Sequence, residues 1–138
     1  MNKKGFTLVE LLATIGIIAV LLILVMSISS SIANNTKIGV YNEKIKSFEA
    51  AGALWGQENR GLVMQSTCQY PPLNFDDNYT YTCYEGLKVD DLVKQKYIKA
   101  DNENGDIFDP RDKNVRLNDL EIIVYHYYNN YYARVLVD

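Results

Sequence analysis

A chain of 138 residues has room for one modest folded domain. Its net charge of −3 is not the basic footprint of a nucleic-acid-binding domain, and one histidine with two cysteines is too few for a structural zinc site of four Cys or His ligands. Tyrosine is unusually common, with eleven residues, and it suits surfaces that are half buried or that meet other proteins.

The first 26 residues combine a short basic head with a long apolar run. The head holds Lys3 and Lys4 and ends at Gly5, and the run from Phe6 to Met26 carries a single charge, at Glu10. A carboxylate within a membrane-length helix costs roughly 2.5–3.5 kcal/mol on insertion scales. We therefore expect the charge of Glu10 to have a partner.

The segment Gly5–Glu10 has the sequence GFTLVE and joins the end of the basic head to the start of the apolar run. In this setting it resembles the processing motif of type IV prepilins and of the pseudopilins of type II secretion and competence systems. In that family a membrane aspartyl peptidase cuts after the glycine and methylates the new amino terminus. The resemblance implies processing between Gly5 and Phe6. It also implies assembly roles for Thr7 and Glu10, with the Glu10 carboxylate pairing with the terminal amine of a neighbouring subunit in a filament.

Two other interpretations of this segment stay open. A cleaved signal peptide also has a basic start and an apolar core, and Ser31-Ile32-Ala33 offers a small-x-small cleavage site. The apolar core of such peptides is about 7–15 residues long, however, and the run in this chain is longer. A plain membrane anchor needs about 20 apolar residues and leaves the Gly-Phe pair and Glu10 unexplained. The first residue of the protein from cells separates the three: methylated Phe6, Asn34 or Met1.

The basic head also predicts the orientation of the chain. Lys3 and Lys4 place the amino terminus on the cytoplasmic side of the membrane and the remainder outside it. We expect a leader at 1–5, a transmembrane or filament-core helix at 6–30 and a globular domain at 31–138 that includes the amphipathic half of the helix. By the resemblance, its partners are copies of itself and other pilins, prepilin peptidase, an assembly ATPase with a platform protein, and the membrane. DNA would be a partner only of a competence pseudopilin.

Helical periodicity continues beyond the apolar run. The sequence predicts one helix from about Phe6 to about Asn59, apolar on all sides in its first half and with one apolar stripe in its second. Gly56 and Gly61 suit the end of this helix. The residues of the stripe are Ile38, Tyr41, Ile45, Phe48, Gly52 and Trp55.

The middle of the chain alternates loops with short elements. We expect a loop with room for one short strand at 62–75, a strand at 79–84 that Gly86 ends, a short helix at 89–97 and a polar loop at 100–114. Cys68 and Cys83 would lie outside the cytoplasm, where a disulfide persists. By closing a loop of the chain, such a bond would stabilise the fold by roughly 3 kcal/mol. The alternative is two free buried thiols.

The clearest strand pair comes last. Residues 121–128 and 131–137 flank Asn129-Asn130, which tolerate the positive φ of a two-residue hairpin turn, and that turn would set Val124 opposite Val135. Both faces of this hairpin are rich in apolar or aromatic groups, so the pattern leaves open which one covers the helix. The expected fold is α+β and pilin-like: a long amino-terminal helix packed in its second half on a small antiparallel sheet.

No catalytic set emerges, and we expect a structural subunit rather than an enzyme. His126 is the single histidine and is expected to be a structural residue, packed or at the surface, rather than a general base. The acidic loop offers a weak calcium site at Asp101, Glu103 and Asp106, but its spacing does not match an EF-hand, so a solvated loop without a cofactor is expected. The segment 91–98 with Asp109-Pro110 resembles Gram-positive pilin-like proteins.

Three functions remain open at this stage. The first is a subunit of a type IV pilus or of a type II secretion-like pseudopilus. The second is a competence pseudopilin that helps to draw in DNA, for which grouped basic residues would be the sign. The third is a membrane-anchored binding domain with a prepilin-like leader, for which a concave pocket with converging polar groups would be the sign.

Overall fold

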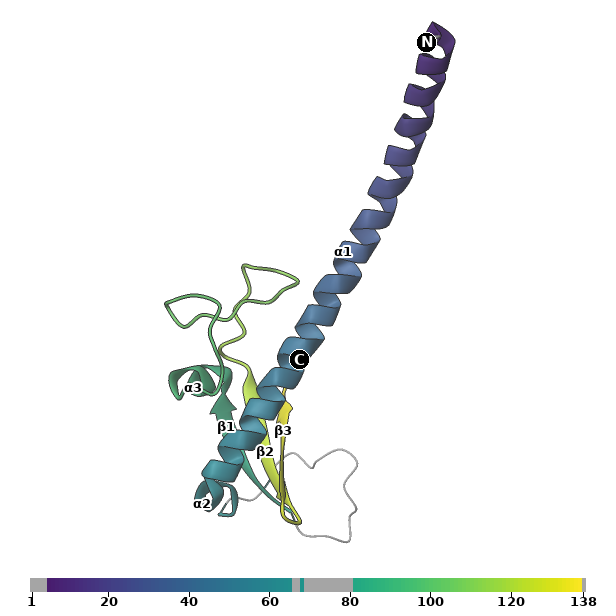
Figure 1. Ribbon diagram of the computed structural model, residues 1–138. Helices are drawn as coiled ribbons and strands as arrows, with labels where there is room; N and C mark the ends of the chain where they lie inside the picture. The colour runs from purple at the N-terminus through teal and green to yellow at the C-terminus, as the bar shows by residue number, and fades with distance from the viewer. Residues whose placement is uncertain (1–4, 66–67, 69–80, 138) are drawn as a thin grey trace. The chain divides into compact units, whose positions relative to one another are not determined.

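The structure is a computed structural model that describes residues 5–65, 68 and 81–137, with the backbone alone at 27–30. The chain forms two compact units, Met1–Lys37 and Ile38–Asp138. Its elements, in chain order, are α1 (Leu8–Glu58), α2 (Arg60–Val63), β1 (Thr82–Lys88), α3 (Val89–Lys94), β2 (Glu121–Tyr127) and β3 (Asn130–Val135) (Figure 1). The strands form one antiparallel sheet in the order β1-β2-β3, which confirms the α+β architecture expected from the sequence.

Helix α1 begins and ends within two residues of the bounds that the sequence predicts, but its end is not made by the two glycines. Gly56 lies inside α1 and Gly61 lies inside α2, so the two glycines bracket the end of α1 at Glu58, but neither is its C-cap as the sequence suggested. Ile38, the first residue of the expected apolar stripe, is 51% exposed, whereas Phe48 and Trp55 are 1% and 4% exposed. The stripe is thus buried only towards its carboxyl-terminal end.

Glycines allow α1 to approach the sheet closely. A Cβ atom on Gly52 would lie 2.9 Å from Ala133 Cβ and 3.0 Å from Ile122 Cγ2, and a Cβ atom on Gly56 would overlap Val124 Cγ1. Carbon atoms in ordinary contact are about 3.5–4.0 Å apart, so a larger residue would push the helix away from the strands. The role of Gly56 is therefore close packing, which explains why it stands within the helix.

The β2–β3 hairpin is present, but its register differs from the prediction by two residues. Val124 lies opposite Ala133 rather than Val135, and the two turn residues are Tyr128 and Asn129. Tyr128 takes the positive φ of the turn, at 54°. Because a shift of two residues keeps every side chain on its face, the alternation of the strands did not distinguish the two registers.

Both faces of the sheet carry clusters of buried side chains. The face that packs on α1 carries Ile122 and Val124 of β2 with Val135 of β3. The opposite face carries a smaller cluster in which Cys83, Ile123 and Tyr125 are at most 2% exposed. The question that the sequence left open is thus answered: the even-numbered residues of β2 cover the helix.

Strand β1 and helix α3 depart from their predicted ends. Gly86 does not end β1; it has a φ of 91°, and the pairing with β2 shifts there in a bulge, a conformation that glycine adopts without strain. Helix α3 ends at Lys94 rather than Tyr97, because Lys96 takes a left-handed φ of 65° and the Tyr97 N–H turns back to the Leu92 carbonyl at 2.9 Å. The predicted loop and strand at 62–84 lie partly outside the described residues, at 66–67 and 69–80.

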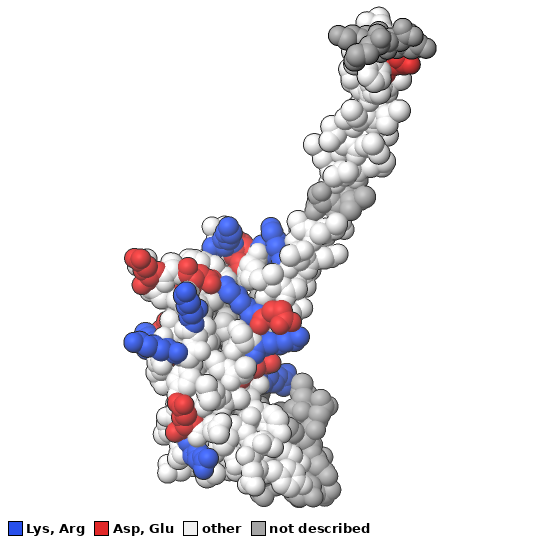
Figure 2. Space-filling view, in the orientation of Figure 1, with Lys and Arg blue, Asp and Glu red and all other residues white. Residues whose placement is uncertain are grey.

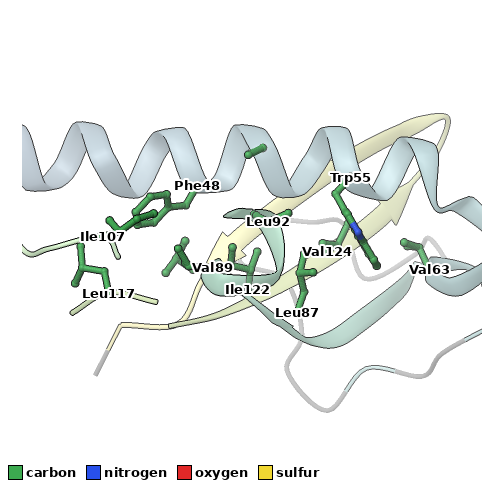
Figure 3. Packing of buried hydrophobic residues seen from close by; sticks show 12 residues of the cluster. Phe48, Trp55, Val63, Leu87, Val89, Leu92, Ile107, Leu117, Ile122 and Val124 are labelled. Carbon is green, nitrogen blue, oxygen red and sulfur yellow. The ribbon is translucent and has the colours of Figure 1, made fainter. Parts of the chain in front are cut away.

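One hydrophobic core joins α1, the sheet, α3 and the loop of residues 99–118 (Figure 3). Trp55 fixes one end of it: its indole N–H donates to Gln95 Oε1 at 3.0 Å, and its ring centroid lies 5.1 Å from that of Tyr84. The polar end of this large ring is therefore satisfied where its apolar body is buried. The buried members are Phe48, Ala51, Trp55, Val63, Leu87, Val89, Leu92, Ile107, Leu117, Ile122, Val124 and Val135.

Candidate functional site

The start of α1 is closed by a reciprocal pair of hydrogen bonds between Thr7 and Glu10. The Thr7 N–H donates to Glu10 Oε2 at 3.0 Å, and the Glu10 N–H donates to Thr7 Oγ1 at 3.3 Å. Helix α1 begins at Leu8, so Thr7 is its N-cap and Glu10 its third residue, and together they form a capping box. The Thr-x-x-Glu spacing is the local sequence signal of this capping box.

This capping geometry places the Glu10 charge at a favourable position and uses one of the two carboxylate oxygens. A negative charge in the first turn is stabilised by the helix dipole. Among the described residues no donor contacts Glu10 Oε1, so one carboxylate oxygen remains available to a group outside the chain. The geometry thus accommodates both a role within the chain and a role between chains.

The expected cleavage point lies in open surroundings. Gly5 precedes the helix, no atom lies within 4 Å of the position that its Cβ would occupy, and the Phe6 side chain is 84% exposed. The structure therefore presents the peptide bond between these two residues before the first helical turn. Lys3 and Lys4 lie outside the described residues.

The apolar part of α1 has no protein covering. An 18-residue window of this helix has a mean hydropathy of 3.0, and none of it is buried, so the helix is long and apolar enough to cross a membrane. The turns from Leu8 to Met26 would extend about 28 Å, close to the thickness of a bilayer core of about 30 Å. Thr14 satisfies its hydroxyl by donating to the Leu11 carbonyl at 2.8 Å, which leaves the surface of this stretch apolar apart from its start.

The two cysteines meet in a disulfide on the sheet face that lies opposite α1. Cys68 and Cys83 are bonded, with 5.6 Å between their Cα atoms and a sequence separation of 15, which confirms the predicted pair. Cys83 is fully buried in β1 among Ile123 and Tyr125, and Cys68 packs against this cluster. The bond therefore fastens the chain after α2 to β1, an edge strand of the sheet.

The acidic loop uses its carboxylates for contacts within the protein. Asp101 Oδ2 accepts from Lys44 Nζ at 2.6 Å and from the Phe108 N–H at 2.8 Å, and Asp106 Oδ1 pairs with Arg116 at 2.7 Å. Burial works against the charged form of Asp101, but Lys44 and the Phe108 N–H outweigh it and lower the pKa of this carboxyl. Each of these two carboxylates thus already faces a cation.

The weak calcium candidates are not gathered into a ligand set. Asp101 and Asp106 have the cationic partners just described, and Glu103 lies exposed between them. The part of the chain that the structure describes holds no group of three His, Cys, Asp or Glu side chains suited to a metal ion. We therefore propose no metal site in this loop.

A second contact, which sequence reasoning missed, fastens the same loop to α1. Arg111 forms a bidentate pair with Asp109, with Nη2 2.6 Å from Oδ2 and Nε 3.0 Å from Oδ1, and its guanidinium carbon lies 3.5 Å from the centre of the Tyr41 ring. The guanidinium lowers the pKa of the buried Asp109 carboxyl. The Asp-x-Arg spacing is its one local signal, because Tyr41 is seventy residues away in sequence.

The single histidine is packed against an aromatic ring, as the sequence analysis expected. His126 is half buried in β2, and its ring centroid lies 4.9 Å from that of Tyr131 on β3. A cross-strand aromatic pair of this kind stabilises a hairpin.

Residues 1–30 match a family model described as the prokaryotic N-terminal methylation motif. This stretch contains the expected cleavage point, the capping box and the apolar part of α1, and the match confirms the resemblance to type IV prepilins and pseudopilins that the sequence first indicated. Proteins that carry the motif are structural rather than enzymatic. No curated protein and no solved structure matched the chain. Nothing in these comparisons bears on the likeness to Gram-positive proteins.

Proposed function

We propose that this chain is a structural subunit of a type IV pilus or of a type II secretion-like pseudopilus. In this proposal prepilin peptidase removes residues 1–5 and methylates Phe6, and an assembly ATPase with a platform protein moves the subunit from the membrane into a filament. The match of residues 1–30 to the methylation motif supports the processing step. The subunit waits in the membrane with its carboxyl-terminal unit outside the cytoplasm, where the disulfide of that unit persists.

The observation that carries the assembly step is the bare apolar surface of α1. Its large apolar side chains from Phe6 to Met26 are 54–84% exposed. A contiguous apolar patch of this kind is unfavourable in water. Lipid covers it in the membrane, and the same segments of neighbouring copies cover it in a filament. Exchange of lipid for helix contacts keeps this surface dry throughout, so one segment serves as anchor and as filament core.

Glu10 is the polar element of this surface and gives the assembly its alignment. Its Oε2 atom caps α1, and its Oε1 atom has no donor among the described residues. In our proposal the amine of a neighbouring Phe6 supplies the missing positive charge, which offsets the cost of a carboxylate in an apolar environment.

The charge distribution does not favour DNA uptake over the other filament roles. On the face drawn in Figure 2, acidic and basic side chains are interspersed over the folded unit, and no basic stripe stands out among its described residues. A nonspecific DNA-binding surface gathers Lys and Arg on one side. Genes that neighbour this one would separate a secretion filament from a competence filament.

The decisive experiment compares Glu10→Ala and Glu10→Gln with the wild-type chain in cells. Mass spectrometry of the amino terminus reports processing, and electron microscopy of sheared filaments reports assembly. Glutamine keeps the cap, because its side-chain oxygen still accepts from the Thr7 N–H, but it carries no charge. We expect N-methylated Phe6 in all three proteins and a large loss of filaments in both variants. Normal filaments from Glu10→Gln would reduce Glu10 to a helix cap, and an unprocessed Met1 in the wild type would overturn the proposal.

A further inference from the structure

One asparagine of this chain stands directly before a glycine, in the loop of residues 99–118. Asn104-Gly105 is the only Asn-Gly pair in the sequence. We propose that Asn104 is a site of spontaneous deamidation, in which its side-chain amide is converted into a carboxylate through a cyclic imide. This inference concerns the chemistry of the loop and goes beyond the proposed function, on which it does not depend.

The reaction joins the side chain of Asn104 to the next backbone nitrogen. The Gly105 nitrogen attacks Asn104 Cγ, the bond from Cγ to Nδ2 breaks, and Nδ2 leaves as ammonia with the proton that the Gly105 nitrogen gives up. Water then opens the imide ring. Its attack at Cγ gives aspartate in an ordinary backbone, and its attack at the main-chain carbonyl carbon gives isoaspartate, whose backbone runs through Cβ and Cγ. Water is the one co-reactant, and no group is oxidised or reduced.

The nitrogen that attacks is accessible and only weakly held. Gly105 has no side chain to crowd the approach of its nitrogen to the neighbouring Cγ, and even a Cβ atom at this position would meet nothing closer than Val93 Cγ1, at 3.8 Å. Its N–H donates to the Asn102 carbonyl at 3.3 Å, which is longer than the usual distance of about 2.9–3.0 Å. Little is therefore lost when this N–H leaves its acceptor.

The amide that is attacked is exposed and free to turn. Asn104 lies at the surface, where water can reach it. Its backbone N–H donates to Asn102 Oδ1 at 3.1 Å, but within the described part of the chain no hydrogen bond holds its side-chain amide. The side chain can therefore rotate towards the Gly105 nitrogen without breaking a contact.

Two other asparagines of the same loop are held in place and serve as a comparison. Asn102 Oδ1 accepts from two backbone N–H groups, and its Nδ2 donates to Asp106 Oδ2 at 3.0 Å. Asn118 is 2% exposed, and its Oδ1 accepts from the Ile107 N–H at 2.8 Å. Both precede residues that carry a Cβ atom. Position before glycine, exposure and a free amide thus coincide at Asn104.

Conversion of Asn104 changes a loop that is fastened on both sides of it. The Asp101 N–H donates to the Asp106 carbonyl at 2.8 Å, so the chain that contains Asn104 is closed into a turn of fixed length. Isoaspartate adds a methylene group to the backbone of this turn, and either product adds a negative charge between two carboxylates. We expect the modification to loosen the loop, which Asp101 joins to Lys44 of α1 at 2.6 Å.

The experiment follows the folded full chain, purified in detergent, during incubation in mildly alkaline buffer, which favours loss of the amide proton. Trypsin cuts after Lys99 and Arg111 and so gives one peptide that holds both Asn102 and Asn104. Deamidation raises its mass by about 1 Da, because a hydroxyl replaces an amino group. Electron-transfer fragmentation places the change and separates isoaspartate from aspartate. We expect Asn104 to convert about tenfold faster than Asn102, and both products to appear.

The matched control is Asn104→Gln, incubated in the same way. Glutamine keeps an amide, but its longer side chain forms the corresponding ring much more slowly, and the backbone accepts it because the φ of Asn104 is not positive. This peptide should keep its mass. The melting temperature of the incubated wild type should fall below that of the incubated control, and equal values would contradict the effect on the loop.

Three results would overturn the proposed site. Asn104 that stays intact in the folded chain but converts in urea would show that the fold protects it. Equal rates at Asn102 and Asn104 would remove the selectivity, and aspartate without isoaspartate would exclude the imide. The measurement uses the purified chain and needs no filament, so its failure leaves the proposed function untouched.

Discussion

The approach of α1 to the sheet at Gly52 yields a quantitative prediction. In Gly52→Ala the new methyl carbon would lie 2.9 Å from Ala133 Cβ and 3.0 Å from Ile122 Cγ2, at least about 0.5 Å closer than ordinary carbon contacts. Neither neighbour can swing aside, because Ala133 Cβ is fixed to the backbone and Ile122 is fully buried and branched at Cβ. The helix or the strands must therefore move.

Overpacking of a well-packed core costs about 1–3 kcal/mol, and alanine recovers up to about 1 kcal/mol of helix propensity. We therefore expect Gly52→Ala to lower the free energy of unfolding by about 1–2 kcal/mol. For a unit of this size that is a fall in melting temperature of roughly 4–15 °C. Gly39→Ala is the matched control, since nothing lies within 4 Å of its Cβ position, and it should gain up to about 1 kcal/mol.

The assay is thermal unfolding of the full chain in detergent, followed by near-ultraviolet circular dichroism of the buried Trp55. A methyl exchange tests the cause: in Gly52→Ala/Ala133→Gly the crowded methyl group moves from the strand to the helix. The double variant should lose less stability than the two single changes together, because the crowding is relieved. A Gly52→Ala protein as stable as Gly39→Ala, or strictly additive losses in the double variant, would refute this packing argument.

Three further predictions concern the folded unit. Replacement of both Cys68 and Cys83 by serine should lower the free energy of unfolding by about 3 kcal/mol in urea denaturation, and an unchanged midpoint would contradict a stabilising disulfide. Because Arg111 holds the pKa of Asp109 below its ordinary value of 3.8, this ion pair should stabilise the unit above about pH 4 and stop doing so as the pH falls through the lower, folded-state pKa. Asp109→Asn should therefore be less stable than the wild type at pH 7 and approach it in acid; a difference independent of pH would count against the assignment. Tyr128→Asn should leave the melting temperature nearly unchanged, because relief of the positive φ offsets the lost ring contact with Tyr127; a loss of more than about 1 kcal/mol in the free energy of unfolding would contradict this balance.

Sequence alone determined the features that depend on neighbours along the chain. The apolar run and the period of the second half of α1 predicted a long helix, because helix formation and membrane partition depend on local side chains, and the motif at Gly5–Glu10 indicated a processing site. The capping box was equally local and could have been found from the Thr-x-x-Glu spacing. The strand pattern around Asn129-Asn130 also predicted the hairpin, and the inferred compartment favoured the pairing of Cys68 with Cys83 over two free thiols.

Tertiary structure alone decided the features that depend on contacts between distant segments. The hairpin registers that set Val124 opposite Val135 or Ala133 place the same side chains on the same faces, so the sequence pattern is satisfied by both. In the observed register the small Ala133 lies under Gly52, where the helix comes closest. By sequence Gly56 suits a helix end, whereas in the fold it allows α1 to pack closely on the sheet. This difference also depends on contacts between distant segments. Register, face and close approach are decided by steric fit between surfaces, and no single segment carries that information.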